Sequence, residues 1–227
     1  MLKENLAAVR ENIAAAAEKS GRRAEDIRLI AATKTVEPAR IQELLSLGVT
    51  CLGENRAQEL LAKYGQFAPE PEWHMIGHLQ TNKVKQILDK VTLIHSVDSI
   101  RLAEMINRCA GGMGRTADIL VEINIAGEDN KYGIQPEQTG DFIEQLSDYS
   151  NICVKGLMCI APYVMNPEYN RNIYKKMSNI FVDMQAVFAH NMGVKYLSMG
   201  MSGDYRVAIE EGANMVRIGT ALFGERG

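Results

Sequence analysis

The stretch "LIAATKTVEP", residues 29–38, combines a strand pattern with a chemically active residue type. Five of its first six residues are small or apolar, and this run predicts a buried strand. Lys34 stands at the end of that strand, between Thr33 and Thr35. A lysine in this place is either a solvated strand end or an amine positioned for chemistry. The rest of the sequence has to distinguish these two interpretations.

Seven further apolar runs follow the first one, and amphipathic segments separate them. The eight predicted strands cover residues 27–34, 49–55, 73–77, 91–98, 117–124, 153–160, 196–202 and 214–219. Near-continuous apolar strands that alternate with helices indicate a parallel sheet with both faces covered. Eight such units predict an α/β fold, a single (β/α)8 TIM-type barrel over residues 1–227. The alternative is an open doubly wound sheet, but no GxGxxG motif follows the first strand.

Helices are predicted between the strands, and one more precedes them. Segment 38–48 begins with proline and ends with glycine, and segment 98–110 has an aspartate or serine cap. The longest helical pattern covers residues 167–191. The N-terminal segment reads as an extra helix that plugs or flanks the barrel.

Composition excludes several classes of protein. The net charge of the 227 residues is −3 and the charged residues form no basic stripe, so we expect no nucleic-acid partner. No apolar run is long enough to span a membrane, and the N-terminus lacks the apolar core of a signal peptide. The cysteines are scattered, which predicts reduced thiols in a cytoplasmic protein and no metal site; they are Cys51, Cys109, Cys153 and Cys159.

In a barrel, active sites lie at the C-terminal ends of the strands. Lys34 is at such an end, and an amine that is partly desolvated there becomes nucleophilic and forms Schiff bases. Other polar or functional side chains fall at the same end of the predicted barrel. They are Asn55, His78, Asn124, Met158, Ser202 and Arg217.

Two loops after the last two strands have the composition of anion sites. One contains Ser202, Gly203 and Asp204 before a helix, and the other contains Gly219 and Thr220 before a short terminal helix. Each loop alone is also typical of a plain helix cap or turn. Together they match the place where barrels often hold a phosphate. A Schiff-base lysine opposite a phosphate site indicates either pyridoxal 5′-phosphate (PLP) or a sugar-phosphate aldolase.

Six motifs carry a resemblance to a known family. They are "AATKT", "GENRAQE" (53–59), "WHMIGHLQTNK" (73–83), "GLM" (156–158), "LSMGMSGDYRVAIEEG" (197–212) and "VRIGTALFG" (216–224). The chain thereby resembles the YggS/PROSC family of PLP homeostasis proteins, whose fold is similar to the N-terminal barrel of alanine racemase. The resemblance covers about 190 residues, from the first strand to the C-terminus.

The resemblance also implies roles for individual residues. Lys34 would carry PLP as a Schiff base, and Arg217 would face the pyridine nitrogen. The phosphate would be held by Ser202, Gly219 and Thr220. Three more residues are assigned to the cofactor site: Asn55, His78 and Met199. From the residues alone, Asn55 is equally a helix cap and His78 equally a residue that packs against a loop. The lesser alternative for Arg217 is a strand-end arginine paired to a surface carboxylate.

Three functions are compatible with these residues. The first, implied by the resemblance, is a non-catalytic PLP carrier in intracellular PLP homeostasis, a monomer that supplies PLP-dependent apoenzymes. The second is a PLP-dependent amino-acid racemase, and the third is an aldolase. Arginine stays protonated and leaves the pyridine nitrogen unprotonated, which weakens PLP as an electron sink. The sequence ends at Gly227, so we expect no second domain to supply the second base that racemisation needs, and we assign no catalytic residue.

Side chains that could act as bases beside Lys34 are also few in the sequence. Tyr163 and Tyr205 are the tyrosines expected nearest the barrel mouth. No carboxylate is a strong candidate for a relay beside the lysine. This disfavours the aldolase.

Overall fold

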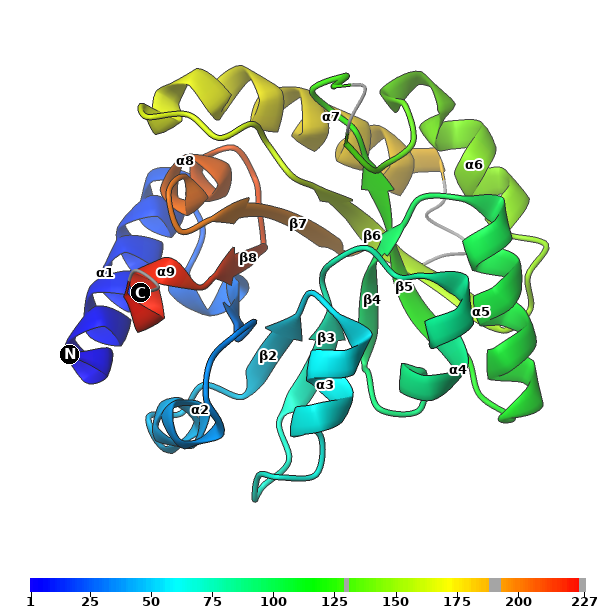
Figure 1. The fold of residues 1–227 in the computed structure, drawn as a ribbon. Helices are drawn as coiled ribbons and strands as arrows, with labels where there is room; N and C mark the ends of the chain where they lie inside the picture. Colours follow the sequence, from blue (N-terminus) through cyan, green and yellow to red (C-terminus); the bar gives the residue numbers. More distant parts are fainter. Residues whose placement is uncertain (129–130, 188–192, 225–227) are drawn as a thin grey trace.

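The computed structural model describes residues 1–128, 131–187 and 193–224 (Figure 1). Within these residues, eight strands close into a barrel in the order β1 to β8. All neighbouring strands pair in parallel, and β1 pairs with β8 from Arg28↔Met215 to Ala31↔Ile218. The (β/α)8 barrel predicted from the sequence is confirmed, and the open doubly wound sheet is excluded.

Each strand falls on one of the eight predicted apolar runs, with ends that differ by no more than two residues. The strands are β1 (Arg28–Ala32), β2 (Cys51–Glu54), β3 (Glu72–Met75), β4 (Leu93–Val97), β5 (Ala117–Ile123), β6 (Ile152–Cys159), β7 (Tyr196–Met201) and β8 (Met215–Ile218). The α-helices are α1 (Leu2–Lys19), α2 (Pro38–Ser46), α3 (Ala57–Lys63), α4 (Val84–Ile87), α5 (Ile100–Gly112), α6 (Thr139–Leu146), α7 (Arg171–Val187), α8 (Tyr205–Glu210) and α9 (Thr220–Phe223).

The ends of the helices follow local sequence signals. Helix α2 begins at Pro38, and Gly48 adopts a φ of +82° just after its end. Ser99 caps α5, because its hydroxyl oxygen accepts the N–H of Leu102 at 3.4 Å. The longest predicted helix is shorter than expected at its start, since residues 167–170 form a 3₁₀ turn before α7. Its predicted end, at residues 188–191, lies outside the described residues.

Apolar side chains fill two layers. The inside of the barrel holds a small cluster of Ile30, Ala32, Cys51, Ile76, Leu93, Leu120, Met158 and Met215. A larger cluster fills the space between the outer face of the sheet and the helices. This is the arrangement expected for strands that are apolar on both faces.

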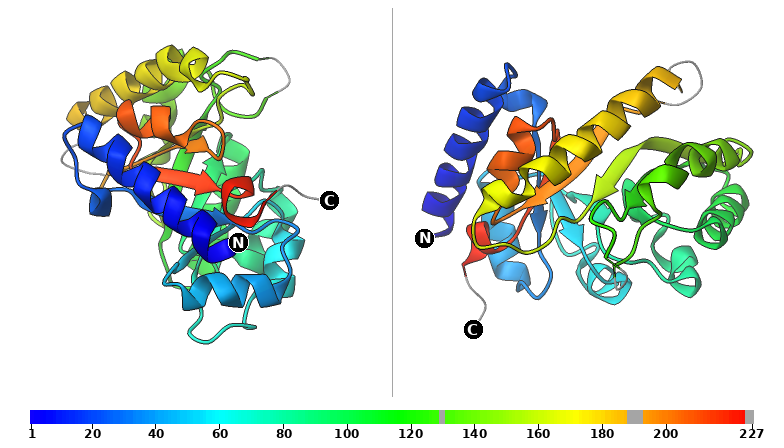
Figure 2. Two further views of the ribbon diagram at one scale, coloured as in Figure 1. Left: turned by 90° about the vertical axis from the view of Figure 1, so that its left-hand side faces the viewer. Right: turned by 90° about the horizontal axis from the view of Figure 1, so that it is seen from above.

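Helix α1 flanks the barrel and does not plug it. Its buried positions Leu2, Leu6, Val9 and Ile13 recur at spacings of three and four, so they lie on one side of the helix. That side packs against α8 and α9, the last two helices of the chain (Figure 2, left). The first and last parts of the sequence therefore lie side by side.

Two further expectations concern the whole chain. None of the described helices is both long and apolar enough to cross a membrane. All four cysteines are unpaired in the structure, as their scattered positions predicted.

Candidate functional site

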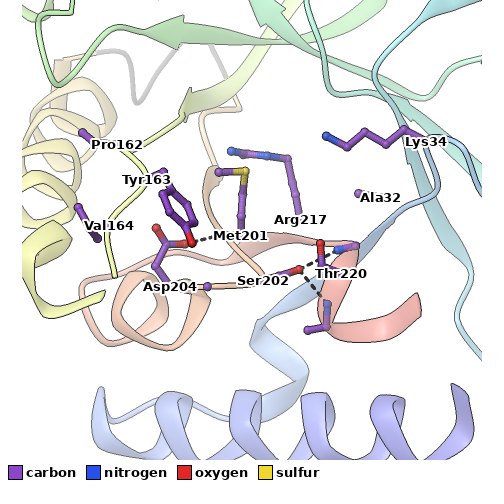
Figure 3. A pocket seen from close by; sticks show the side chains of 13 residues that line it. Ala32, Lys34, Pro162, Tyr163, Val164, Met201, Ser202, Asp204, Arg217 and Thr220 are labelled. Carbon is purple, nitrogen blue, oxygen red and sulfur yellow. Dashed lines mark hydrogen bonds between the residues drawn. The ribbon is translucent and has the colours of Figure 1, made fainter. Parts of the chain in front are cut away.

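A hollow of about 520 Å³ opens at the C-terminal ends of β1, β7 and β8 (Figure 3). This volume is in the range of small-molecule sites. Five of the residues predicted to bind the cofactor line it together: Lys34, Ser202, Arg217, Gly219 and Thr220. The hollow therefore joins the predicted amine to both predicted anion loops.

Lys34 lies in a turn that follows β1 and is half-buried. The turn is closed by a hydrogen bond of 2.9 Å from the N–H of Val36 to the carbonyl oxygen of Thr33. In Figure 3 the Lys34 side chain extends from the end of β1 toward Arg217 and the space above Thr220. The amine thus points into the hollow and not outward along the strand.

Ser202 connects the two anion loops. Its hydroxyl oxygen accepts the backbone N–H groups of Gly219 and Ala221, both at 3.1 Å. With the oxygen occupied in this way, the hydroxyl hydrogen is left to donate to a ligand. Thr220 is the first residue of α9, so its N–H has no partner within the helix, and it lines the same hollow.

Asp204 fixes the loop that carries Ser202. One carboxylate oxygen accepts the hydroxyl of Tyr174 at 2.6 Å and the amide of Asn170 at 3.0 Å. The other accepts the backbone N–H of Met201 at 2.8 Å. The loop between β7 and α8 is therefore held from two sides.

Arg217 is almost completely buried, with only 4% of its surface exposed. The hydrogen bonds of its side chain that the structure shows go to uncharged oxygens: the carbonyl and hydroxyl of Ser198 and the carbonyl of Cys159. Burial lowers the pKa of Arg217, but arginine begins so high that it remains a cation. Arg217 is therefore not the surface-paired arginine that the sequence left open. It is a buried cation that borders the hollow.

A buried chain of polar groups continues from Arg217 into the barrel. The Arg217 guanidinium donates to the Ser198 hydroxyl at 2.6 Å, and Ser198 lies 3.0 Å from Nδ1 of His95. Nε2 of His95 lies 2.9 Å from Nδ1 of His74. Burial lowers the pKa of His74 to about 3 and that of His95 well below its ordinary value, so both rings are neutral.

The direction of this chain follows from its first bond. Arg217 can only donate, so the Ser198 oxygen accepts from it. We therefore assign the Ser198 hydroxyl as the donor to Nδ1 of His95, and Nε2–H of His95 as the donor to Nδ1 of His74. Nε2 of His74 then carries a hydrogen and has no partner within the described residues. The sequence analysis did not identify this series of buried polar groups, although "WHM" and "LIHSV" each place a histidine inside an apolar run.

A carboxylate that the sequence analysis did not single out also lies at this end of the barrel. Glu122, on β5, is 4% exposed. Burial and the charge of Asp98 raise its pKa to about 7, while the positive charge of Arg217 acts in the opposite direction. Glu122 borders a smaller pocket together with Asn124 and Tyr132.

The two tyrosines expected near the mouth differ in position. Tyr163 borders the hollow and is 90% exposed. Tyr205 is buried and its hydroxyl interacts with Asn12 of α1, so the expectation for Tyr205 was wrong. The cause is the first turn of α8, which directs this side chain toward α1.

Three predicted cofactor residues lie apart from the hollow. Asn55 and His78 line a neighbouring polar pocket. His78 stacks on Tyr132 with ring centroids 3.9 Å apart. Helix α3 is capped at Arg56 without a side-chain hydrogen bond, so the structure does not show Asn55 as its cap. Met199 is completely buried in the outer core.

Comparisons with known proteins bear on this site. The family model of the alanine racemase N-terminal domain matches residues 5–227. The pyridoxal phosphate homeostasis protein of Aquifex aeolicus is 45% identical over 98% of this chain and 97% of its own length. The chain belongs to the family of pyridoxal phosphate homeostasis proteins. Another member, from Escherichia coli K12, is 35% identical and covers 98% of this chain and 95% of its own length.

Solved structures agree with this family. PipY of Synechococcus elongatus PCC7942 with PLP bound is 32% identical, with a TM-score of 0.85, and the match covers 99% of this chain and 100% of PipY. Alanine racemase of Clostridium difficile 630 in complex with cycloserine is 22% identical, with a TM-score of 0.74 over 99% of this chain and 59% of the enzyme. The racemase likeness is a likeness of fold alone.

Proposed function

We propose that this protein binds PLP and acts in PLP homeostasis as a carrier of the cofactor. The observation that carries the proposal is the hollow in which the Lys34 amine faces Ser202, Thr220 and Arg217. The PLP-bound structure of the relative PipY supports it. The relatives that are named for PLP homeostasis support the cellular role.

The residues of the hollow fit the parts of PLP. The Ser202 hydroxyl and the backbone N–H of Thr220 would donate to the phosphate, and Gly219 would allow the phosphate to approach the backbone closely. Donors of this kind suit a dianion. Arg217 would donate to the pyridine nitrogen. The Lys34 amine would be the group that attaches PLP covalently through its aldehyde, with release of water.

Asn55, His78 and Met199 remain predicted cofactor residues. Asn55 and His78 would contribute from the neighbouring pocket and Met199 from beneath the loop. None of the three lines the hollow itself.

We further propose that the protein does not turn over amino acids appreciably. Bound PLP supplies a pyridine ring that can accept electrons, and it does so best when its nitrogen is protonated. Arg217 remains a cation and would donate to that nitrogen, which would keep it unprotonated. The alternative is an amino-acid racemase, which the match to the racemase domain model favours.

The remaining parts of the proposal concern the protein as a whole. Residues 1–227 would form one domain that is monomeric and cytoplasmic. PLP-dependent apoenzymes would receive the cofactor from it.

The test of PLP attachment uses purified protein mixed with PLP. We expect a visible Schiff-base band, and borohydride followed by peptide mapping should place the pyridoxyl group on Lys34. Lys34→Ala should remove the band while its far-ultraviolet circular dichroism stays unchanged. A label on Lys131 or Lys195 with Lys34 unmodified would overturn the assignment. If the protein forms no Schiff-base band with PLP, the aldolase interpretation would remain.

The test of the racemase alternative uses L-alanine and other L-amino acids in deuterated water. Deuterium at Cα and D-isomers are measured over time. Turnover at about 1 s⁻¹ or faster, the low end for ordinary enzymes, would restore the racemase. Slow exchange without a defined product would favour the carrier.

A further inference from the structure

The turn that carries Lys34 contains an unusual backbone conformation. Thr35 has a φ of +61°, and within the described residues it is the one non-glycine residue with a positive φ. Turns with a positive φ at their third residue usually place glycine or asparagine there. A β-branched residue in this region is strained, and it persists only when its surroundings hold it.

Helix α3 supplies the contact that holds Thr35. The Glu59 carboxylate accepts the backbone N–H of Thr35 at 2.9 Å. Glu59 is only partly buried, so its side chain is not part of the packed core. Its effect is local: it fixes the residue that directly follows Lys34.

The residue before Lys34 is held by a buried ion pair. Lys63 of α3 donates to the carbonyl oxygen of Thr33 and to Oε1 of Glu54, both at 2.7 Å. The same Glu54 oxygen accepts the Thr33 hydroxyl at 2.7 Å. Both ends of the turn are therefore fixed by side chains from β2 and α3.

Burying this ion pair has a large desolvation cost, which offsets much of the attraction between the two charges. Glu54 is completely buried, and its second oxygen, Oε2, has no hydrogen-bond partner within the described residues. Burial raises the pKa of Glu54, which means that its charged form is disfavoured there. Apolar residues often replace such a pair without loss of stability, so stability alone does not explain its presence.

We propose that Glu54, Lys63 and Glu59 are positioning residues for the Lys34 amine. They hold the strained turn so that the amine already points into the hollow before PLP arrives. The inference rests on the proposed function, because it assigns these residues to the Schiff-base step. In that step the amine nitrogen bonds to the aldehyde carbon and one water is released, and misplacing the amine slows it.

The first experiment compares two substitutions of Glu59. Glu59→Ala removes the acceptor for Thr35, whereas Glu59→Gln keeps a carbonyl oxygen that can accept the same N–H. We expect the rate of Schiff-base band formation at fixed PLP concentration to fall on the order of tenfold in Glu59→Ala and to stay near wild type in Glu59→Gln. Glu70→Ala is the matched control, since Glu70 also accepts a backbone N–H, that of Gly65, away from the Lys34 turn.

A second variant replaces the buried pair with apolar residues, Glu54→Leu together with Lys63→Met. We expect its melting temperature to equal or exceed that of the wild type and its Schiff-base formation to be slowed on the order of tenfold. Pyridoxamine 5′-phosphate, which has the phosphate but no aldehyde, should bind all variants as it binds the wild type. A damaged fold would instead weaken the binding of both ligands.

The outcomes separate this inference from the proposed function. A wild-type protein that forms no Schiff base on Lys34 contradicts the proposed function. A wild type that forms it, with Glu59→Ala equally fast, overturns only the positioning role. Equal slowing in Glu59→Ala and Glu59→Gln would also overturn it. If the double variant does not fold, the two Glu59 variants decide alone.

Discussion

The Ser202 oxygen accepts two backbone N–H groups, which leaves its hydroxyl hydrogen to donate to a ligand in the hollow. The residue therefore both shapes the site between β7 and β8 and contributes a donor to it. Loss of the hydroxyl should affect the phosphate end of a ligand and leave the aldehyde end unchanged. The two ends can be measured separately.

We predict that Ser202→Ala weakens PLP binding by about 1.5–3 kcal/mol, the scale of one hydrogen bond to a charged group. Titration followed by the visible band measures this change. Pyridoxal, which lacks the phosphate, should bind the wild type far more weakly than PLP and should not distinguish the two proteins. Equal affinity of the wild type for pyridoxal and PLP would contradict the assignment of this region as a phosphate site.

Glu122 should make the stability of the protein depend on pH. Its pKa in the folded state is about 7, above its ordinary value of 4.5, so the folded protein holds a proton that the unfolded chain releases. The stabilisation is complete below pH 4.5 and is lost as the pH rises toward 7. We expect Glu122→Gln, which is neutral at every pH, to lack this loss.

Denaturant unfolding of the wild type and Glu122→Gln at pH 4.5 and pH 8 tests this expectation. The difference in the free energy of unfolding between the two proteins should change by about 2–3 kcal/mol between these conditions. Here the wild type becomes relatively less stable at the higher pH. Parallel pH profiles would show that Glu122 titrates normally.

At the scale of elements, the apolar runs were sufficient to find the barrel. The strands are largely buried on both faces, so most of their residues are apolar and they stand out from the amphipathic segments around them. The loops with Ser202 and Thr220 were also recognisable, because small and hydroxyl residues directly before a helix leave N–H groups exposed. Lys34 was identified by its place at a strand end.

The polar residues inside the barrel were not predictable in the same way. His74, His95 and Glu122 each lie within a mostly apolar run. A run of this kind does not reveal which of its residues face the same interior space, since that depends on the stagger of neighbouring strands. The Glu54–Lys63 pair was missed for a related reason, because its partners come from different elements and meet only in the fold.

Helix α1 should contribute to stability through its apolar side. Leu6 is 2% exposed, whereas Lys3 of the same helix is exposed. We predict that Leu6→Ala lowers the free energy of unfolding by about 2–5 kcal/mol, the usual range for a buried leucine. Lys3→Ala should stay within about 0.5 kcal/mol of the wild type. Denaturant titration of both variants measures the two values.

The whole molecule is closed by the pairing of β1 with β8, so no strand edge separates one half of the barrel from the other. Neither half would retain a complete sheet without the other. This arrangement supports the proposal that residues 1–227 form one domain. It also leads to an expectation for unfolding.

We predict a single cooperative unfolding transition. Trp73 is the one tryptophan of the sequence and is buried on β3, so its fluorescence reports on the first half of the barrel. Far-ultraviolet circular dichroism reports on all helices and strands. The two signals should change together with denaturant. Separate transitions, or a stable half-length fragment after limited proteolysis, would indicate two units.

The packing of α1 against α8 and α9 can form only late in synthesis, because the contacting helices are far apart in the sequence. The ribosome synthesises residues 2–19 well before residues 205–223, which cover their apolar side. At the usual 5–20 residues per second, the apolar side of α1 waits roughly ten to forty seconds for its partners. During that interval the apolar side of α1 lacks the two helices that cover it in the folded barrel.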